Sequence, residues 1–182
     1  WMWQIPLQHR TGNGYVFCSR FLDKAKAEET LLQRISGKTI NTPKPFAFKA
    51  GRRKKVWNKN CYALGLASGF IEPLEATALV LIEISAKMIA EQFPVNRSTM
   101  DIVAKRFNNT LGHHWRRIID FLKLHYVLTK RTDTEYWRDN CLAGTIPDSL
   151  QELLALWKVQ SPWLHDEMRR EEMFPSASHP HM

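Results

Sequence analysis

The spacing of hydrophobic positions along this 182-residue chain changes near residue 75. Before that point, aromatic and apolar residues alternate with polar ones over residues 1–21 and 44–63, which predicts strands. The first of these segments contains the turn-forming cluster Gly12–Asn13–Gly14, so it predicts a β-hairpin that turns at these glycines. Between the two segments, a charged and alanine-rich stretch follows Asp23, a typical N-cap residue, and predicts a surface helix that ends near Gly37.

After residue 75, apolar residues recur every three to four positions, which is the spacing of buried helix faces. This spacing predicts one helix over 77–93 and a long second helix over 97–130, with a kink or break near Gly112. A third helix is predicted from Asp148 through Trp157, ending before Ser161–Pro162. The fold class expected is therefore α+β, with a strand-rich portion over 1–75, a helical portion over 76–174 and a disordered tail over 175–182.

Composition supports an ordered chain, since 44% of the residues are hydrophobic and 11% aromatic. The net charge of +8 is spread along the sequence, with one dense cluster from Arg52 to Lys55. A solvated edge strand protected by lysines accounts for this cluster, and attraction of the phosphate groups of a ligand or of an acidic partner is the alternative. Nucleic acid is not expected as a partner, because no helix-turn-helix, zinc-finger or aromatic RNA-binding pattern accompanies the charge.

Metal and membrane sites are not predicted either. The three cysteines, Cys18, Cys61 and Cys141, have no metal-ligand or disulfide spacing, which favours a reducing, cytoplasmic environment. Adjacent His113 and His114 would point about 100° apart on a helix, and the histidines of the last few residues have no neighbouring carboxylate or cysteine ligands. No apolar run reaches the ~18 residues of a membrane span, and no signal peptide is recognised.

Candidate chemistry is concentrated in residues 65–77, Gly-Leu-Ala-Ser-Gly-Phe-Ile-Glu-Pro-Leu-Glu-Ala-Thr. Glycines allow the backbone to approach a flat ligand, and the run turns at Pro73 before a predicted helix begins. Because the first N–H groups of a helix lack partners within it, this junction can hold an anion. Glu75 lies at the junction with few polar neighbours in the sequence.

Residues 65–77 resemble the segment of flavin-dependent tryptophan halogenases that passes beside the isoalloxazine ring of the flavin. The first six residues, Trp-Met-Trp-Gln-Ile-Pro, match the Trp-x-Trp-x-Ile-Pro signature of the same family. The resemblance implies a fold like that of flavoprotein monooxygenases, which begins with a dinucleotide-binding Gly-x-Gly-x-x-Gly half. The chain lacks this pattern and any counterpart of the family's catalytic lysine, so we expect a central to C-terminal part of a larger halogenase.

The resemblance implies a catalytic role for Glu75 and a halide site at the backbone amides of Thr77 and Ala78. It also implies that Leu66 and Leu79 contact the flavin. Simpler structural explanations are a helix-capping carboxylate for Glu75, helix-start packing for Thr77 and Ala78, and ordinary core positions for the leucines. Ala76 stands where tryptophan-specific members commonly have serine, which puts specificity for tryptophan in question.

By the same resemblance, Trp1, Trp3, Ile5 and Pro6 line the passage between flavin and substrate, where large rings exclude water. The alternative is that the two tryptophans form the buried face of a strand. No metal site is implied.

The activity implied is halogenation of tryptophan or another indole-like aromatic with FADH2, oxygen and halide. A separate flavin reductase and the N-terminal half of the enzyme are the implied partners, and this part alone is expected to be inactive. Two alternatives stay open at this point. One is a related flavin monooxygenase that does not halogenate, and the other is a non-catalytic basic binding module.

Overall fold

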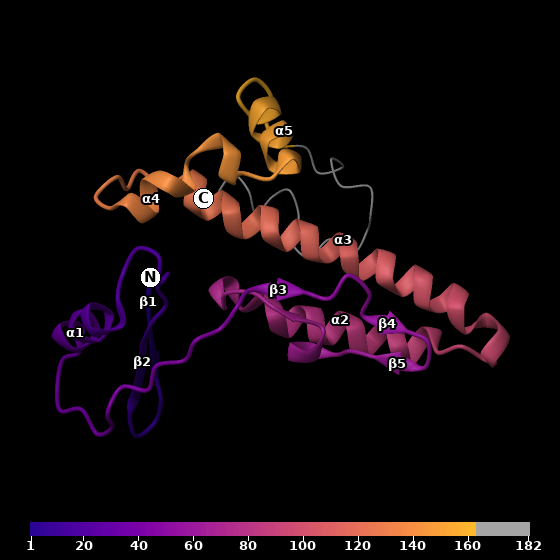
Figure 1. The fold of residues 1–182 in the computed structure, drawn as a ribbon, viewed down its shortest axis with the longest axis horizontal. Coiled ribbons are helices and arrows are strands. Elements are labelled where there is room, and N and C mark those ends of the chain that lie inside the picture. The colour runs from indigo at the N-terminus through magenta and orange to yellow at the C-terminus, as the bar shows by residue number, and fades with distance from the viewer. Residues whose placement is uncertain (163–182) are drawn as a thin grey trace. The chain divides into compact units, whose positions relative to one another are not determined.

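A computed structural model of the chain describes residues 1–162, which form two compact units, Trp1–Phe48 and the part from Lys49 onward (Figure 1). The composition change near residue 75 lies inside the second unit, where short strands give way to helices. Residues 163–174 of the predicted helical portion and the predicted tail 175–182 are outside the described part. None of the described helices combines the length and apolar character that a bilayer crossing requires.

The first unit begins with an antiparallel hairpin of β1 (Met2–Pro6) and β2 (Thr11–Tyr15). The prediction of a turn at Gly12–Asn13–Gly14 is wrong, because these residues belong to β2 and the chain reverses at residues 7–10. The glycines serve packing instead. Gly14 pairs with Trp3, and a Cβ atom at Gly14 would overlap the Trp3 ring, so only glycine leaves room for this indole.

The predicted helix after Asp23 is confirmed as α1 (Lys24–Arg34). The backbone N–H of Lys26 donates to Asp23 Oδ1 at 3.0 Å, which is the expected N-cap interaction.

Strand structure in the second unit is sparser than the sequence predicts. The short strand β3 (Gly51–Arg52) pairs with β6 (Gly69–Phe70), and β4 (Trp57–Asn58) pairs with β5 (Cys61–Tyr62). Phe46 and Phe48, which contributed to the strand prediction over 44–63, lie outside any strand and are exposed. The basic residues Arg52 to Lys55 are all exposed, but only Arg52 belongs to a strand, β3, and the two lysines of the cluster lie outside any strand.

Two long helices provide most of the core, and both were predicted. They are α2 (Thr77–Gln92) and α3 (Met100–Val127), the latter preceded by the 3-10 turn η3 (Arg97–Thr99). Helix α3 runs through Gly112, so the predicted kink or break is wrong. One cluster of buried residues joins α3 to β4 and consists of Val56, Trp57, Ala104, Phe107 and Leu111. A second cluster joins α2 and α3 and consists of Leu81, Trp115, Ile118 and Leu122.

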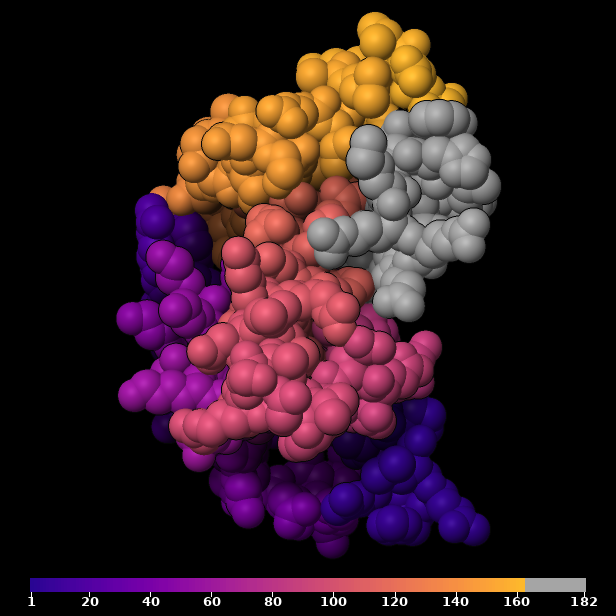
Figure 2. Space-filling model, turned by 90° about the vertical axis from the view of Figure 1, so that its right-hand side faces the viewer, coloured from indigo at the N-terminus to yellow at the C-terminus, as the bar shows by residue number. Residues whose placement is uncertain are grey.

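Asn108 of α3 fixes β4 against the helix through its side-chain amide. Its Oδ1 accepts from the backbone N–H groups of Val56 and Trp57 at 2.8 and 2.9 Å, and its Nδ2 donates to the Trp57 carbonyl at 2.8 Å. The connection from α2 to α3 and the first turns of α3 are coloured pink in Figure 2. This region has several exposed apolar side chains, Phe93, Val95 and Ile102.

After α3 the chain folds back along the same helix, on the side away from α2 in Figure 1. It forms the short helix α4 (Glu135–Asn140), which the hydrophobic spacing did not predict, and the 3-10 turn η4 (Ala143–Thr145). Helix α5 (Asp148–Trp157) follows with the predicted bounds. The α+β prediction is therefore confirmed, with more helix and less strand than the alternation of residues suggests.

Candidate active site

The segment that carries Glu75 is held close to β3 and α3 by a glycine. A Cβ atom at Gly69 would lie 2.8 Å from the backbone Cα of Arg52 and 2.8 Å from the ring of Trp115. Contacts this short do not occur with real side chains, so glycine is required for this packing. Farther along the segment, Ile71 and Leu74 pack against the buried cluster between α2 and α3. The segment that leads to the turn is therefore packed against the core.

The turn itself has an unusual backbone. Glu75 and Ala76, the last two residues of the 3-10 turn η2 (Leu74–Ala76), both have left-handed conformations, with φ of 60° and 52°. For residues other than glycine such conformations cost about 1–3 kcal/mol each and persist only when the surroundings impose them. The side chain of Glu75 is 51% exposed. The backbone is thus strained at the point where the half-exposed carboxylate of Glu75 reaches the surface.

Helix α2 begins immediately after this turn, and no side chain caps it. Ala76 occupies the N-cap position, where it has no side-chain oxygen to accept from the first N–H groups. Thr77 is only 1% exposed, and its buried Oγ1 makes no hydrogen bond with any residue in 1–162. Buried hydroxyls almost always have a partner. An uncapped helix start beside an unpartnered hydroxyl is a suitable place for an anion or a water molecule.

His125 of α3 faces Glu75 across the turn. Its Nε2 lies 3.9 Å from Glu75 Oε1, and its Nδ1 lies 2.9 Å from the Phe121 carbonyl oxygen. A hydrogen on Nδ1 donates to that carbonyl, which leaves Nε2 as the nitrogen toward Glu75. In the sequence His125 belongs to the long helix predicted over 97–130, and nothing there indicates that it lies near Glu75. The two residues come together only through the packing of α3 on the turn.

The predicted flavin-contacting leucines are not core residues. Leu66 is 77% exposed in the 3-10 turn η1 (Gly65–Ala67), and Leu79 is 69% exposed in the first turns of α2. These two elements contact each other. Large apolar side chains exposed on neighbouring elements are what a flat apolar ring would cover, so the residues present fit a flavin.

The residues predicted to line the substrate passage belong to the first unit. Trp1 precedes β1, and Trp3, Ile5 and Pro6 lie within it. Trp3 packs over Gly14 and is 38% exposed, and Ile5 is 53% exposed. The tryptophan pair is therefore not a fully buried core face. The predicted site is divided between the units, with these residues in the first and Glu75, Thr77, Ala78, Leu66 and Leu79 in the second.

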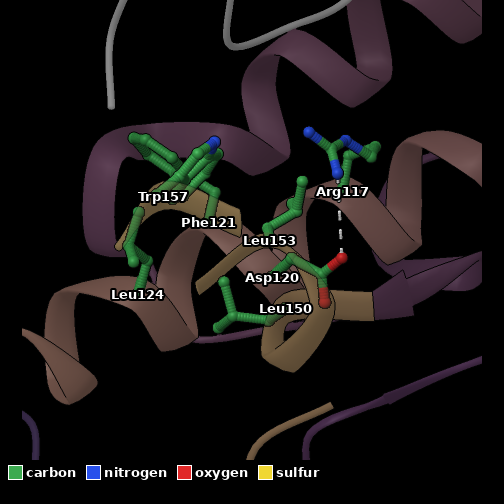
Figure 3. A pocket seen from close by; sticks show the side chains of 7 residues that line it. All are labelled: Arg117, Asp120, Phe121, Leu124, Leu150, Leu153 and Trp157. Atoms are coloured by element: carbon green, nitrogen blue, oxygen red, sulfur yellow. Dashed lines mark ion pairs between the residues drawn. The ribbon is translucent and has the colours of Figure 1, made fainter. Parts of the chain in front are cut away.

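A small cavity between α3 and α5 is a separate feature (Figure 3). Its lining residues are Arg117, Asp120, Phe121, Leu124, Leu150, Leu153 and Trp157. It has room for about one water molecule, so an aromatic substrate does not fit. Burial raises the pKa of the Asp120 carboxyl, and this carboxyl accepts from Ser149 Oγ at 2.8 Å and lies 3.9 Å from Arg117. We interpret this group as the attachment of α5 to α3.

In residues 1–162 no three histidine, cysteine or acidic side chains gather as a metal site would require. His113 and His114 pack ring to ring with centroids 6.0 Å apart. His179 and His181 lie outside the described residues.

Comparison with known proteins identifies the family. The tryptophan halogenase family profile matches residues 1–182. The chain belongs to the tryptophan halogenase family. This confirms the resemblance that the sequence motifs indicate.

Among its relatives, the tryptophan 6-halogenase SttH of Streptomyces toxytricini is 34% identical over 89% of this chain and 31% of its own length. The tryptophan 7-halogenase RebH of Lentzea aerocolonigenes is 31% identical over 87% of this chain and 30% of its own length. A crystal structure of a tryptophan halogenase from Shewanella frigidimarina superposes with a TM-score of 0.92 and is 44% identical, covering 99% of this chain and 35% of that one. The chain thus spans about a third of the length of the relatives it matches.

Proposed function

We propose that this chain forms the part of a flavin-dependent halogenase that holds the halide and faces the substrate, tryptophan or another indole-like aromatic. The observation that carries the proposal is the strained turn, which presents the exposed Glu75 directly before the uncapped start of α2 and the unpartnered Thr77 hydroxyl. Such a turn brings a proton acceptor and an anion site together. Family membership favours this reading over a flavin monooxygenase without halogenation and over a basic binding module.

Each residue has a proposed role. The backbone N–H groups of Thr77 and Ala78 hold the halide at the positive end of the α2 dipole. Leu66 and Leu79 lie against the flavin ring, because they offer exposed apolar surface on adjoining elements. When bound, reduced FAD supplies, with oxygen, the oxidation of the halide to hypohalous acid.

Glu75 assists the substitution on the substrate. A bond forms between a ring carbon and the halogen while the O–halogen bond of hypohalous acid breaks. The carboxylate accepts the proton lost from that carbon and passes it to the departing hydroxide, which leaves as water. The same negative charge stabilises the positive charge that develops on the ring. Trp1, Trp3, Ile5 and Pro6 are proposed to line the passage and exclude water.

The other components of the reaction are assigned to the remainder of the enzyme and to a separate protein. The relatives are about three times as long as the matched region, and we assign the dinucleotide-binding fold and the activating lysine to the remainder of the enzyme. A separate flavin reductase is proposed to supply FADH2. The cytoplasmic location inferred from the cysteines stays a prediction.

The test is product analysis with the full-length protein that contains these residues. The protein is incubated with FAD, a flavin reductase, NADH, oxygen, bromide and either tryptophan or indole, and products are identified by mass spectrometry. We expect a brominated product that requires both bromide and the reductase. Hydroxylated product alone would favour the monooxygenase. The yield of brominated indole is compared with that of brominated tryptophan, because Ala76 in place of serine is expected to relax the specificity for tryptophan.

The binding-module alternative has its own readout. Binding to labelled single- and double-stranded DNA and RNA is measured by fluorescence anisotropy over a series of salt concentrations. Tight binding that falls steeply as salt rises, together with no halogenated product, would contradict the proposed function.

A further inference from the structure

The strained turn needs a support outside itself. Glu75 and Ala76 keep left-handed backbone conformations, and Ala76 offers no side-chain cap that would hold the start of α2 in place. Strained conformations of this kind persist where neighbouring structure imposes them. The contacts that reach the turn from other elements therefore decide where Glu75 lies.

The last turns of α3 provide such contacts. The hydroxyl of Tyr126 donates to Glu72 Oε2 at 2.5 Å, and Glu72 immediately precedes Pro73, where the turn begins. The preceding residue on α3, His125, is the one that lies 3.9 Å from Glu75. Two consecutive residues of α3 thus meet the two carboxylates that flank Pro73 and Leu74.

Tyr126 is itself firmly placed. It is only 6% exposed, and its ring packs against Tyr136 and Trp137 of α4, with centroids 5.9 and 5.7 Å away. Burial raises the pKa of the Tyr126 hydroxyl, and the hydrogen bond to Glu72 raises it further, so this hydroxyl remains a donor. A buried donor on an anchored ring is well suited to fix the position of a loop carboxylate.

We propose that Tyr126 is a positioning residue of the halogenation site, which through its hydrogen bond to Glu72 fixes the turn that places Glu75 and the first amides of α2. The proposal rests on the proposed function, since it concerns the same site. Tyr126 acts through Glu72 and the turn, and no contact of Tyr126 with substrate or halide is part of the proposal.

The test uses conservative variants of the full-length enzyme. Tyr126→Phe keeps the ring and its packing but removes the donor. Glu72→Gln keeps an amide oxygen that can accept from Tyr126, whereas Glu72→Ala removes the acceptor. Tyr62→Phe is the matched control, because Tyr62 also packs in an aromatic cluster of the second unit, with Trp57 and Phe107.

We measure kcat and the KM for bromide and for tryptophan or indole, bromide binding by 81Br NMR line width, and thermal unfolding. We expect Tyr126→Phe and Glu72→Ala to weaken bromide binding and to lower kcat/KM for bromide by about tenfold. Glu72→Gln is expected to retain most of the activity, and Tyr62→Phe to behave as wild type. A simple loss of folded protein would lower the amount of active enzyme without changing the KM or the bromide affinity of the folded fraction.

The outcomes separate the two proposals. If wild-type enzyme makes no halogenated product, the proposed function fails. If wild-type enzyme halogenates but Tyr126→Phe matches it in bromide affinity and kcat/KM, the role of Tyr126 is overturned while the function stands. If Tyr126→Phe does not fold, the two Glu72 variants test the role of Tyr126 instead. Equal activity of Glu72→Gln and Glu72→Ala would also overturn that role.

Discussion

Helix α3 buries one face along most of its length, while the turn that it supports leaves its key residue half exposed in a strained conformation. Along the helix, side chains such as Phe107, Leu111 and Ile118 recur at helical spacing and each is at most 2% exposed. The turn has no such repetition. Its shape depends on a few contacts, including Leu74 in the core and Glu72 on Tyr126.

Substitutions in the helix core and in the turn are expected to have different effects, on stability in the first case and on catalysis in the second. Many residues share the burial of the α2–α3 core, so substitutions there change stability first. Glu75 contributes little buried surface, so its substitution is expected to change chemistry with little effect on folding. The variants below are made in the full-length protein and test this separation, starting with the largest expected effect.

Glu75→Gln keeps the size of the side chain but removes its capacity to accept a proton. We expect the rate of halogenation to fall about 10²–10⁴-fold, the range typical for loss of a proton-transferring group. Thermal unfolding should stay close to that of wild type, because the side chain is 51% exposed. Product formation is followed by liquid chromatography and mass spectrometry. Glu83→Gln, at an exposed position of α2, is the control and should retain full activity.

Phe107→Ala tests the opposite case, since Phe107 is 2% exposed and packs with Trp57 and Tyr62. The cavity left behind is expected to lower the free energy of unfolding by about 3–5 kcal/mol. Urea unfolding measures this loss. Ile102→Ala, on the same helix but 71% exposed, should change stability by less than about 0.5 kcal/mol. Equal effects of the two variants would contradict the assignment of the core.

Gly69→Ala affects both regions, because Gly69 packs against the core and belongs to the segment that leads to the turn. The added methyl group would collide with Arg52 and the Trp115 ring. We expect a loss of about 1–3 kcal/mol from overpacking, together with reduced halogenation as the segment leading to the turn shifts. Unfolding and activity are measured on the same preparation. Gly51→Ala in the partner strand β3 meets nothing within 4 Å and is expected to be neutral. A stable and fully active Gly69→Ala variant would show that the turn does not depend on this close approach.

Asp120→Asn concerns the attachment of α5 to α3 and should have the smallest effect. Because burial raises the pKa of Asp120 above its ordinary value of 3.8, the folded state binds this proton more readily than the unfolded state does. The contribution of Asp120 to stability is therefore greatest at low pH and declines as the pH rises through the raised folded pKa. The Asn variant lacks this decline, so its stability relative to wild type should increase over that window and then level off.

Urea midpoints at a series of pH values above 3.8 measure this difference. Glu152→Gln, on the exposed side of α5, is the control. A constant difference between Asp120→Asn and wild type at every pH would contradict the assigned direction of the pKa.

The sequence by itself determined the helices α1, α2, α3 and α5 and the family. Helices α2, α3 and α5 were predictable because apolar residues recur in them every three to four positions, and α1 because it begins at the N-cap residue Asp23. Both features are local. The motifs around Glu75 and at Trp1–Pro6 indicated the halogenase family before any contact was known. Short, aromatic-rich segments were less informative, since Phe46 and Phe48 have strand character but lie outside any strand.

The tertiary structure decided what depends on residues far apart in the sequence. It showed that Gly14 accommodates the Trp3 ring in a strand rather than forming a turn, and that α3 continues through Gly112. It also brought His125 to Glu75 and Tyr126 to Glu72. Local periodicity records which face of a helix is buried but not which loop is packed against it. The left-handed conformations of Glu75 and Ala76 occur in a turn contacted by residues far away in the sequence, and the spacing of hydrophobic residues carries no signal for them.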